Sequence, residues 1–159
     1  MNLPLLKWFV WWKIFLNGEI IMPGGHLTVA QLTAMLNTIP MEITFVDEDN
    51  INRFFNEGPK DFKRPGMAID REVFSCHPPK VEQQVRHIIG EFRKGTLDKV
   101  PIWMEKNGKT MLVTYMAVRD AAGTYLGTME LVQDMGFAKE HFLSDVKAKE
   151  AALRAGMED

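Results

Sequence analysis

The sequence lacks most of the features that mark enzymes, secreted proteins and nucleic-acid binders. It has one cysteine, Cys76, among 159 residues, which excludes an internal disulfide framework and suits the reducing cytoplasm. A net charge of −2 gives no general attraction to nucleic acid or to an anionic membrane. The chain has no Gly-x-Ser-x-Gly, Walker or Gly-x-Gly-x-x-Gly motif. We therefore predict one cytoplasmic domain that is not an enzyme.

The chain also lacks an apolar run long enough to cross a membrane. Leu3–Leu16 has 14 residues and includes two lysines, whereas a membrane-spanning helix needs roughly 20 apolar residues. This run holds three of the four tryptophans. We expect a short aromatic helix that packs on this domain, on a second copy of the chain or on an upstream domain. Residues 1–26 are assigned to this N-terminal segment or linker.

The first half of the remaining chain predicts one helix and one hairpin. Thr28 begins a capping-box pattern, and apolar residues continue at helical spacing to Ile39. Glu42–Asp47 alternates polar and apolar side chains and predicts a strand, with Ile51–Phe55 as the return strand. The acidic tip between them is typical of a solvated turn. Residues 56–72 are expected to form a loop.

The second half predicts a long helix, three strands and a final helix. Two prolines precede Val81–Phe92, where apolar residues recur at helical spacing. Asn107-Gly108 is a strong signal for a two-residue hairpin turn. Alternation along the last two strands leads us to place Tyr115 and Met129 on the core face and Glu130 on the other face. The expected strands are Val100–Glu105, Lys109–Arg119 and Tyr125–Asp134, and the expected final helix is Phe137–Met157.

Several short segments resemble one particular group of PAS domains, the group found behind hemerythrin-type domains in uncharacterised bacterial proteins. The Cys-His-Pro-Pro sequence is rare in other PAS domains. The resemblance covers residues 27–134 and rests on Leu36–Pro40, Ile43–Glu48, Cys76–Lys80, Ala117–Asp120, Tyr125–Thr128 and Gln133–Asp134.

The resemblance implies an α+β fold of the PAS type. We expect a five-stranded antiparallel sheet with helices on one face, flanked by N- and C-terminal helices, with residues 135–159 forming the C-terminal one. The implied role is sensory: the domain binds a small ligand in its central cavity and relays its state through the flanking helices. The alternative is a ligand-free dimerisation or interaction module. Expected partners are a second copy and an upstream hemerythrin-like domain, and no di-iron site is expected in this chain.

The start of the long helix carries the sharpest ligand candidates. The resemblance places His77 beside the central cavity, where an imidazole is able to ligate haem iron. A helix N-terminus lowers the pKa of a thiol, so Cys76 is a second candidate, as a ligand or a redox sensor. The structural alternative is that His77 hydrogen-bonds a loop carbonyl while Cys76 is a small buried side chain. The scattered histidines predict no metal site.

The last strands carry four further candidates for ligand binding. Tyr115 and Gln133 are expected to orient a small molecule in an apolar cavity that Met104 and Met129 help to line. The same side chains are equally what a filled core contains. The ligand itself is unknown, with haem as one candidate.

Overall fold

The computed structural model describes residues 15–16, 18–58, 60–62 and 68–155. The chain divides into two compact units. The first is Met1–Pro40 with Asn56–Gly58, and the second is Met41–Phe55 with Pro59–Asp159.

The first unit contains a small antiparallel sheet of β1 (Phe15–Leu16), β2 (Glu19–Met22) and β3 (Gly25–Thr28). No strand is predicted here from the sequence, so the hairpin of β2 and β3 is a correction. The expected aromatic helix lies outside the described residues, except for its last two residues, which form β1.

Helix α2 (Val29–Thr38) follows β3 directly and begins as predicted. The Gln31 N–H donates to Thr28 Oγ1 over 3.1 Å, and the Thr28 N–H donates to Gln31 Oε1 over 2.9 Å. These two bonds form a capping box, which satisfies N–H groups that have no partner within the helix.

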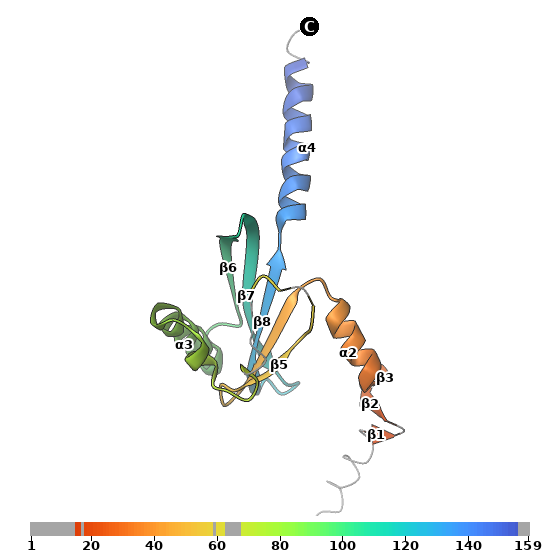
Figure 1. Cartoon of the computed structure of the whole chain (residues 1–159), viewed down its shortest axis with the longest axis vertical. Helices are drawn as coiled ribbons and strands as arrows, with labels where there is room; N and C mark the ends of the chain where they lie inside the picture. Colours follow the sequence, from red (N-terminus) through yellow and green to blue (C-terminus); the bar gives the residue numbers. More distant parts are fainter. Residues whose placement is uncertain (1–14, 17, 59, 63–67, 156–159) are drawn as a thin grey trace, which may run out of the picture. The chain divides into compact units, whose positions relative to one another are not determined.

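The second unit is built on a five-stranded antiparallel sheet with the strand order β5-β4-β8-β7-β6. This confirms the predicted α+β fold and its five-stranded sheet (Figure 1). The three C-terminal strands lie within one residue of the predicted bounds. The strands are β4 (Glu42–Asp47), β5 (Asn52–Phe55), β6 (Lys99–Lys106), β7 (Lys109–Arg119) and β8 (Tyr125–Asp134).

One face of this sheet, here called the inner face, is covered by the short helix η2 (Val73–Cys76) and by α3 (Pro79–Lys94). Pro79 occupies the first turn of α3, and Gly95 ends the helix in the left-handed conformation, as the sequence predicts. The apolar stripe of α3 faces inward, and Phe92 is fully buried. The first core cluster joins this cover to the sheet and consists of Val46, Val73, Phe74, Val85 and Ile89.

The second core cluster lies on the inner face of β7 and β8. Its buried members are Met111, Val113 and Val132, with Phe62 packed against them from the loop after β5. Tyr115 and Glu130 are paired across the two strands, as are Val113 and Val132. Because paired residues point to the same face, Glu130 is on the inner face, and the predicted placement of Glu130 on the other face is wrong.

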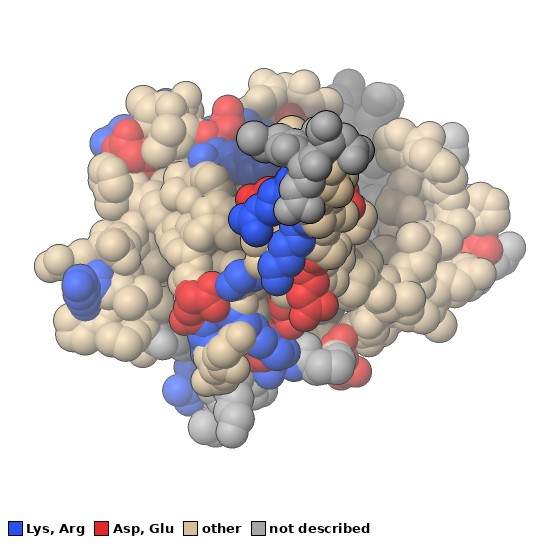
Figure 2. Space-filling view, turned by 90° about the horizontal axis from the view of Figure 1, so that it is seen from above, with Lys and Arg blue, Asp and Glu red and all other residues tan. Residues whose placement is uncertain are grey.

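Helix α4 (Gly136–Ala155) continues from β8 and has no buried residue. It runs away from the sheet at the end where β8 finishes (Figure 1). Seen from its C-terminal end, side chains of both charges gather around it (Figure 2). Its apolar side chains are exposed, including Phe142 at 66%.

Candidate functional site

The structure separates the six residues that the sequence suggests for ligand binding. Tyr115 and Met104 are partly buried and both pack against the second core cluster on the inner face. Gln133 pairs with Leu112, and Met129 pairs with Met116, so both lie on the opposite face of the sheet. The prediction that Tyr115 and Gln133 face one cavity is therefore wrong. A register one residue away from the predicted one reverses every side chain of a strand.

His77 follows η2 and precedes α3, at the junction predicted from the sequence. Its ring Nδ1 lies 2.8 Å from the carbonyl oxygen of Val73. Because a carbonyl only accepts hydrogen bonds, Nδ1 carries the hydrogen, which leaves Nε2 as the acceptor of a neutral ring. The backbone of Cys76 ends η2, and its side chain lies outside the described residues.

The most distinctive buried group was missed by the sequence analysis. Glu42 begins β4 on the inner face and is only 6% exposed. Its Oε1 accepts two backbone hydrogen bonds, from Asp61 N–H over 2.6 Å and from Phe62 N–H over 3.2 Å. Its Oε2 is buried and has no hydrogen-bond partner within the part of the chain that the structure describes. The sequence did hold the signal, since alternation along Glu42–Asp47 places Glu42, Thr44 and Val46 on one face.

Other polar side chains accompany Glu42 on the inner face. Thr44 lies opposite Glu130, and both are buried. Thr128 is also buried, and its hydroxyl lies 2.7 Å from the Tyr125 hydroxyl. Buried polar groups are costly unless they are paired. The inner face thus joins an apolar cluster to several buried polar groups, a mixture that is typical of ligand sites.

A chain of contacts links Glu42 to the start of α4. The loop that holds Glu42 Oε1 also supplies the Asp61 carboxylate, whose oxygens accept from Lys109 Nζ over 3.0 and 3.1 Å. The same Nζ lies 3.3 Å from Asp134 Oδ2, and Asp134 Oδ1 accepts from the Gly136 N–H over 2.8 Å. The carboxylates of Asp61 and Asp134 raise the pKa of Lys109. The Gly136 N–H and Lys109 lower the pKa of Asp134.

Comparison with known proteins identifies the fold family. A PAS domain family model matches residues 32–136. This chain belongs to the PAS domain family.

Several solved structures are similar to this chain. A C-terminal domain from Streptococcus mutans is 39% identical with a TM-score of 0.73, over 77% of this chain and 96% of that one. A PAS domain from Colwellia psychrerythraea is 15% identical with a TM-score of 0.49, over 68% and 97%. A sensory box sensor histidine kinase from Vibrio cholerae is 12% identical with a TM-score of 0.48, over 65% and 87%. No curated protein matches the chain.

A haem does not fit the inner face of this PAS domain. The macrocycle has no donor for the unpartnered oxygen of Glu42, and it would lie against a second buried carboxylate, Glu130. Burying a carboxylate against an apolar ring is costly. Among the described residues, no three His, Cys, Asp or Glu side chains are grouped to hold a metal ion.

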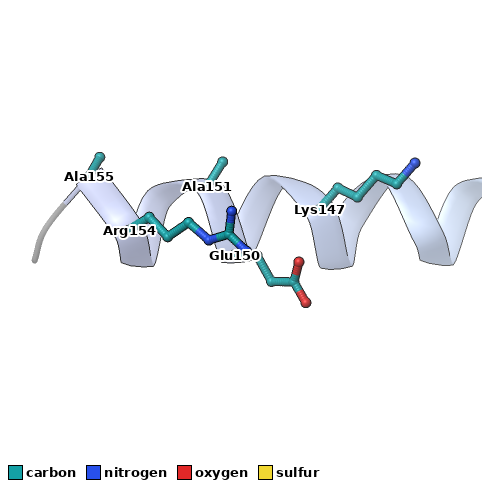
Figure 3. A pocket seen from close by; sticks show the side chains of 5 residues that line it. All are labelled: Lys147, Glu150, Ala151, Arg154 and Ala155. Carbon is teal, nitrogen blue, oxygen red and sulfur yellow. The ribbon is translucent and has the colours of Figure 1, made fainter.

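A hollow on α4 is not a candidate site. It is bordered by side chains from successive turns of that one exposed helix, so it is open to solvent (Figure 3). The hollow is lined by Lys147, Glu150, Ala151, Arg154 and Ala155.

No helix within the described ranges is long and apolar enough to cross a membrane.

Proposed function

We propose that this PAS domain is a sensory domain that binds a small molecule on its inner face, beside Glu42. The observation that carries the proposal is the buried Oε2 of Glu42, for which no described residue supplies a hydrogen-bond donor. An unsatisfied buried polar atom costs about 1–3 kcal/mol. A protein that keeps such an atom is less stable than it would be with the atom hydrogen-bonded. We infer that this oxygen is kept because it binds a ligand.

The surroundings of Glu42 support a small ligand with both polar and apolar parts. Phe62 packs against the second core cluster, and its own N–H holds the other oxygen of Glu42. Tyr115 and Met104 pack against the same cluster. Ligand sites commonly combine an apolar lining with a few placed polar groups. Tyr115 and Met104 therefore stay in the proposed site, whereas Gln133 and Met129 face away from it.

The signal would leave the domain through α4. A ligand that binds Glu42 displaces or tightens the Asp61–Phe62 loop, because that loop is bonded to Glu42 Oε1. Movement of Asp61 shifts Lys109, which also contacts Asp134 at the start of α4. Gly136 is the first residue of α4, and its N–H donates a hydrogen bond to Asp134. This relay needs no contact between the ligand and α4.

Two experiments test the proposal together. Mass spectrometry of the purified domain is expected to find a co-purified small molecule, and hydrogen exchange is expected to show altered protection in the first turn of α4 when it is bound. Lys109→Met is expected to keep ligand binding and lose the change in α4. The control Lys147→Met, on the exposed surface of α4, is expected to behave as the native protein.

The proposal fails if nothing co-purifies and no small probe, whether cationic, neutral or anionic, raises the melting temperature. The relay alone fails if Lys109→Met leaves the change in α4 intact.

His77 and Cys76 have a smaller place in this proposal. The Nδ1 hydrogen bond of His77 to the Val73 carbonyl fixes the ring beside η2, at the end of the inner face away from Glu42, so we assign His77 no contact with a ligand beside Glu42. A redox role of Cys76 is tested by Cys76→Ser, which is expected to abolish peroxide sensitivity of the full-length protein if that role exists. If variants of His77 and Cys76 keep both ligand binding and the peroxide response, the two residues have structural roles only.

A second function, a dimerisation module, is favoured by α4. Its apolar side chains are exposed, with Phe137 at 73% and Leu153 at 68%, and a helix of this kind is stabilised by a partner. The natural partner is α4 of a second copy. Light scattering is expected to show a dimer that Phe142→Glu dissociates, and a native monomer at high concentration would end this proposal. We further infer a cytoplasmic location from the single cysteine. A bacterial source and a hemerythrin-like domain upstream are inferred from the resemblance to the PAS group described above.

A further inference from the structure

The unpartnered oxygen of Glu42 also indicates which chemical class of ligand the site selects. Its Oε1 is held by two backbone N–H groups, so the orientation of the carboxylate is fixed. The remaining oxygen can only accept a hydrogen bond when the group is a carboxylate. A ligand that satisfies Oε2 must therefore bring a donor.

A positively charged donor suits the site better than a neutral one. Hydrogen bonds between two charged groups are shorter and stronger than neutral ones. Glu130 is a second buried carboxylate on the same face, diagonal to Glu42 across β4 and β8 and engaged in an interaction of its own. Diagonal neighbours on a sheet lie about 7–8 Å apart. Both carboxylates favour a cation and disfavour an anion.

Two described lysines beside the Asp61–Phe62 loop have partners of their own. Lys109 contacts Asp61 and Asp134. Lys106 Nζ lies 3.2 Å from the centre of the Phe62 ring, a cation–π contact.

The apolar part of the ligand is indicated by the second core cluster. Val132 lies directly opposite Glu42 on β8, and Phe62 follows the loop residue that bonds Glu42. Both belong to the group that packs around Met111 and Val113. We propose that the site beside Glu42 selects small molecules that join a cationic nitrogen, an amine or an amidine, to a compact apolar body. This inference rests on the proposed function.

A series of probes of one shape and different charge tests it by calorimetry. Benzylamine and benzamidine carry a cationic nitrogen, benzamide is neutral, and benzoate is an anion. The native domain is expected to bind the two cations about ten- to a hundredfold more tightly than benzamide, which is the range for a hydrogen bond to a charged group. Benzoate is expected not to bind.

Two matched variants locate the preference. Glu42→Gln keeps an oxygen for Asp61 and Phe62 but replaces Oε2 with an N–H donor, so it is expected to lose the preference for cations and to gain affinity for benzamide. Glu140→Gln removes the same charge from the exposed surface of α4 and is expected to leave all four affinities unchanged. Circular dichroism and the melting temperature check that both variants fold.

The outcomes separate this inference from the proposed function. If benzamide binds as tightly as benzylamine, or if Glu42→Gln keeps the preference for cations, the inference is wrong while a ligand site on the inner face stands. If a small molecule co-purifies but is neutral or anionic and is displaced by none of the cations, the inference is also wrong. If no probe of any charge binds and nothing co-purifies, the proposed function fails with it.

Discussion

The two ends of the inner sheet face differ in what they bury. At one end, Val46 and Ile89 belong to a cluster of five apolar side chains that α3 and η2 cover. At the other end, Val132 and Phe62 lie in an apolar cluster beside the buried carboxylate of Glu42. Both ends belong to the same sheet and face the same way.

The difference indicates that the two ends of the inner face have different roles, one in stability and one in binding. Burying a large apolar side chain contributes about 1.5–3 kcal/mol to stability, whereas a buried polar atom without a partner costs about 1–3 kcal/mol. The end covered by α3 therefore holds the fold together. The end beside Glu42 keeps a buried carboxylate that lowers stability. This pattern is expected where a residue serves binding and not stability.

The largest expected effect is at the α3 end. Ile89→Ala removes a side chain that is 4% exposed from the first core cluster, and it is expected to lower the free energy of unfolding by about 2–5 kcal/mol. Val81→Ala, on the same helix but 37% exposed, is the control and is expected to cost under about 1 kcal/mol. Urea unfolding measures both, and equal losses would contradict the assignment of the core.

The next effect is at the Glu42 end. Glu42→Leu removes the acceptor of the Asp61 and Phe62 N–H groups and is expected to cost about 1–3 kcal/mol. Glu42→Gln keeps an oxygen for both and is expected to stay within about 1 kcal/mol of the native protein. Urea unfolding separates them, and a leucine variant more stable than the glutamine one would show that the two N–H bonds do not matter.

A third effect concerns the β4–β5 turn and depends on pH. Burial raises the pKa of Asp47, but hydrogen bonds from the Ile51 N–H, Arg53 and the Asp49 N–H outweigh it and lower this pKa below 3.8. A lowered pKa means that the ionised group stabilises the fold above the unfolded pKa, and that this contribution is lost as pH falls below 3.8. Asp47→Asn is expected to cost about 1–2 kcal/mol at pH 7 and much less near pH 2.5. Chemical unfolding at both pH values measures the loss of stability caused by Asp47→Asn. An equal loss at the two pH values would refute this prediction.

The smallest effect on stability is expected at the relay. Lys109 is 45% exposed, and its contacts with Asp61 and Asp134 are surface ion pairs, which are worth about 0–1 kcal/mol. Lys109→Met is therefore expected to leave the free energy of unfolding close to that of the native protein. Thermal unfolding checks this, and a larger loss would mean that the pairs hold the fold and not a signal.

Much of the second unit follows from local sequence patterns. Asn107-Gly108 fixes the hairpin of β6 and β7, because few other dipeptides accept two positive φ angles. Pro79 and Gly95 mark the ends of α3 for similar backbone reasons. Gly127 has a reason that only the fold reveals: a Cβ there would lie 2.2 Å from the Val46 carbonyl oxygen, where β8 and β4 approach closely.

The candidate site was harder to predict because it depends on pairing between distant strands. Alternation shows which residues of β8 share a face, but not which face is buried. Met129 and Leu131 are apolar and Glu130 is charged, so hydrophobicity favoured the wrong face. The same preference hid Glu42, since a glutamate at the start of a strand is usually exposed. The polar residues that the fold buries are therefore the ones that sequence patterns assign to solvent.

The most direct test of the ligand site is a titration of the ¹⁵N-labelled domain with benzylamine, followed by NMR. The largest shifts of amide signals are expected at Asp61, Phe62 and Val132, which surround Glu42, with a smaller shift at Gly136 through the relay. Glu42→Gln is expected to abolish them. Shifts confined to the exposed face of α4, of equal size in the native protein and in Glu42→Gln, would contradict a binding site at the Glu42 end of the sheet.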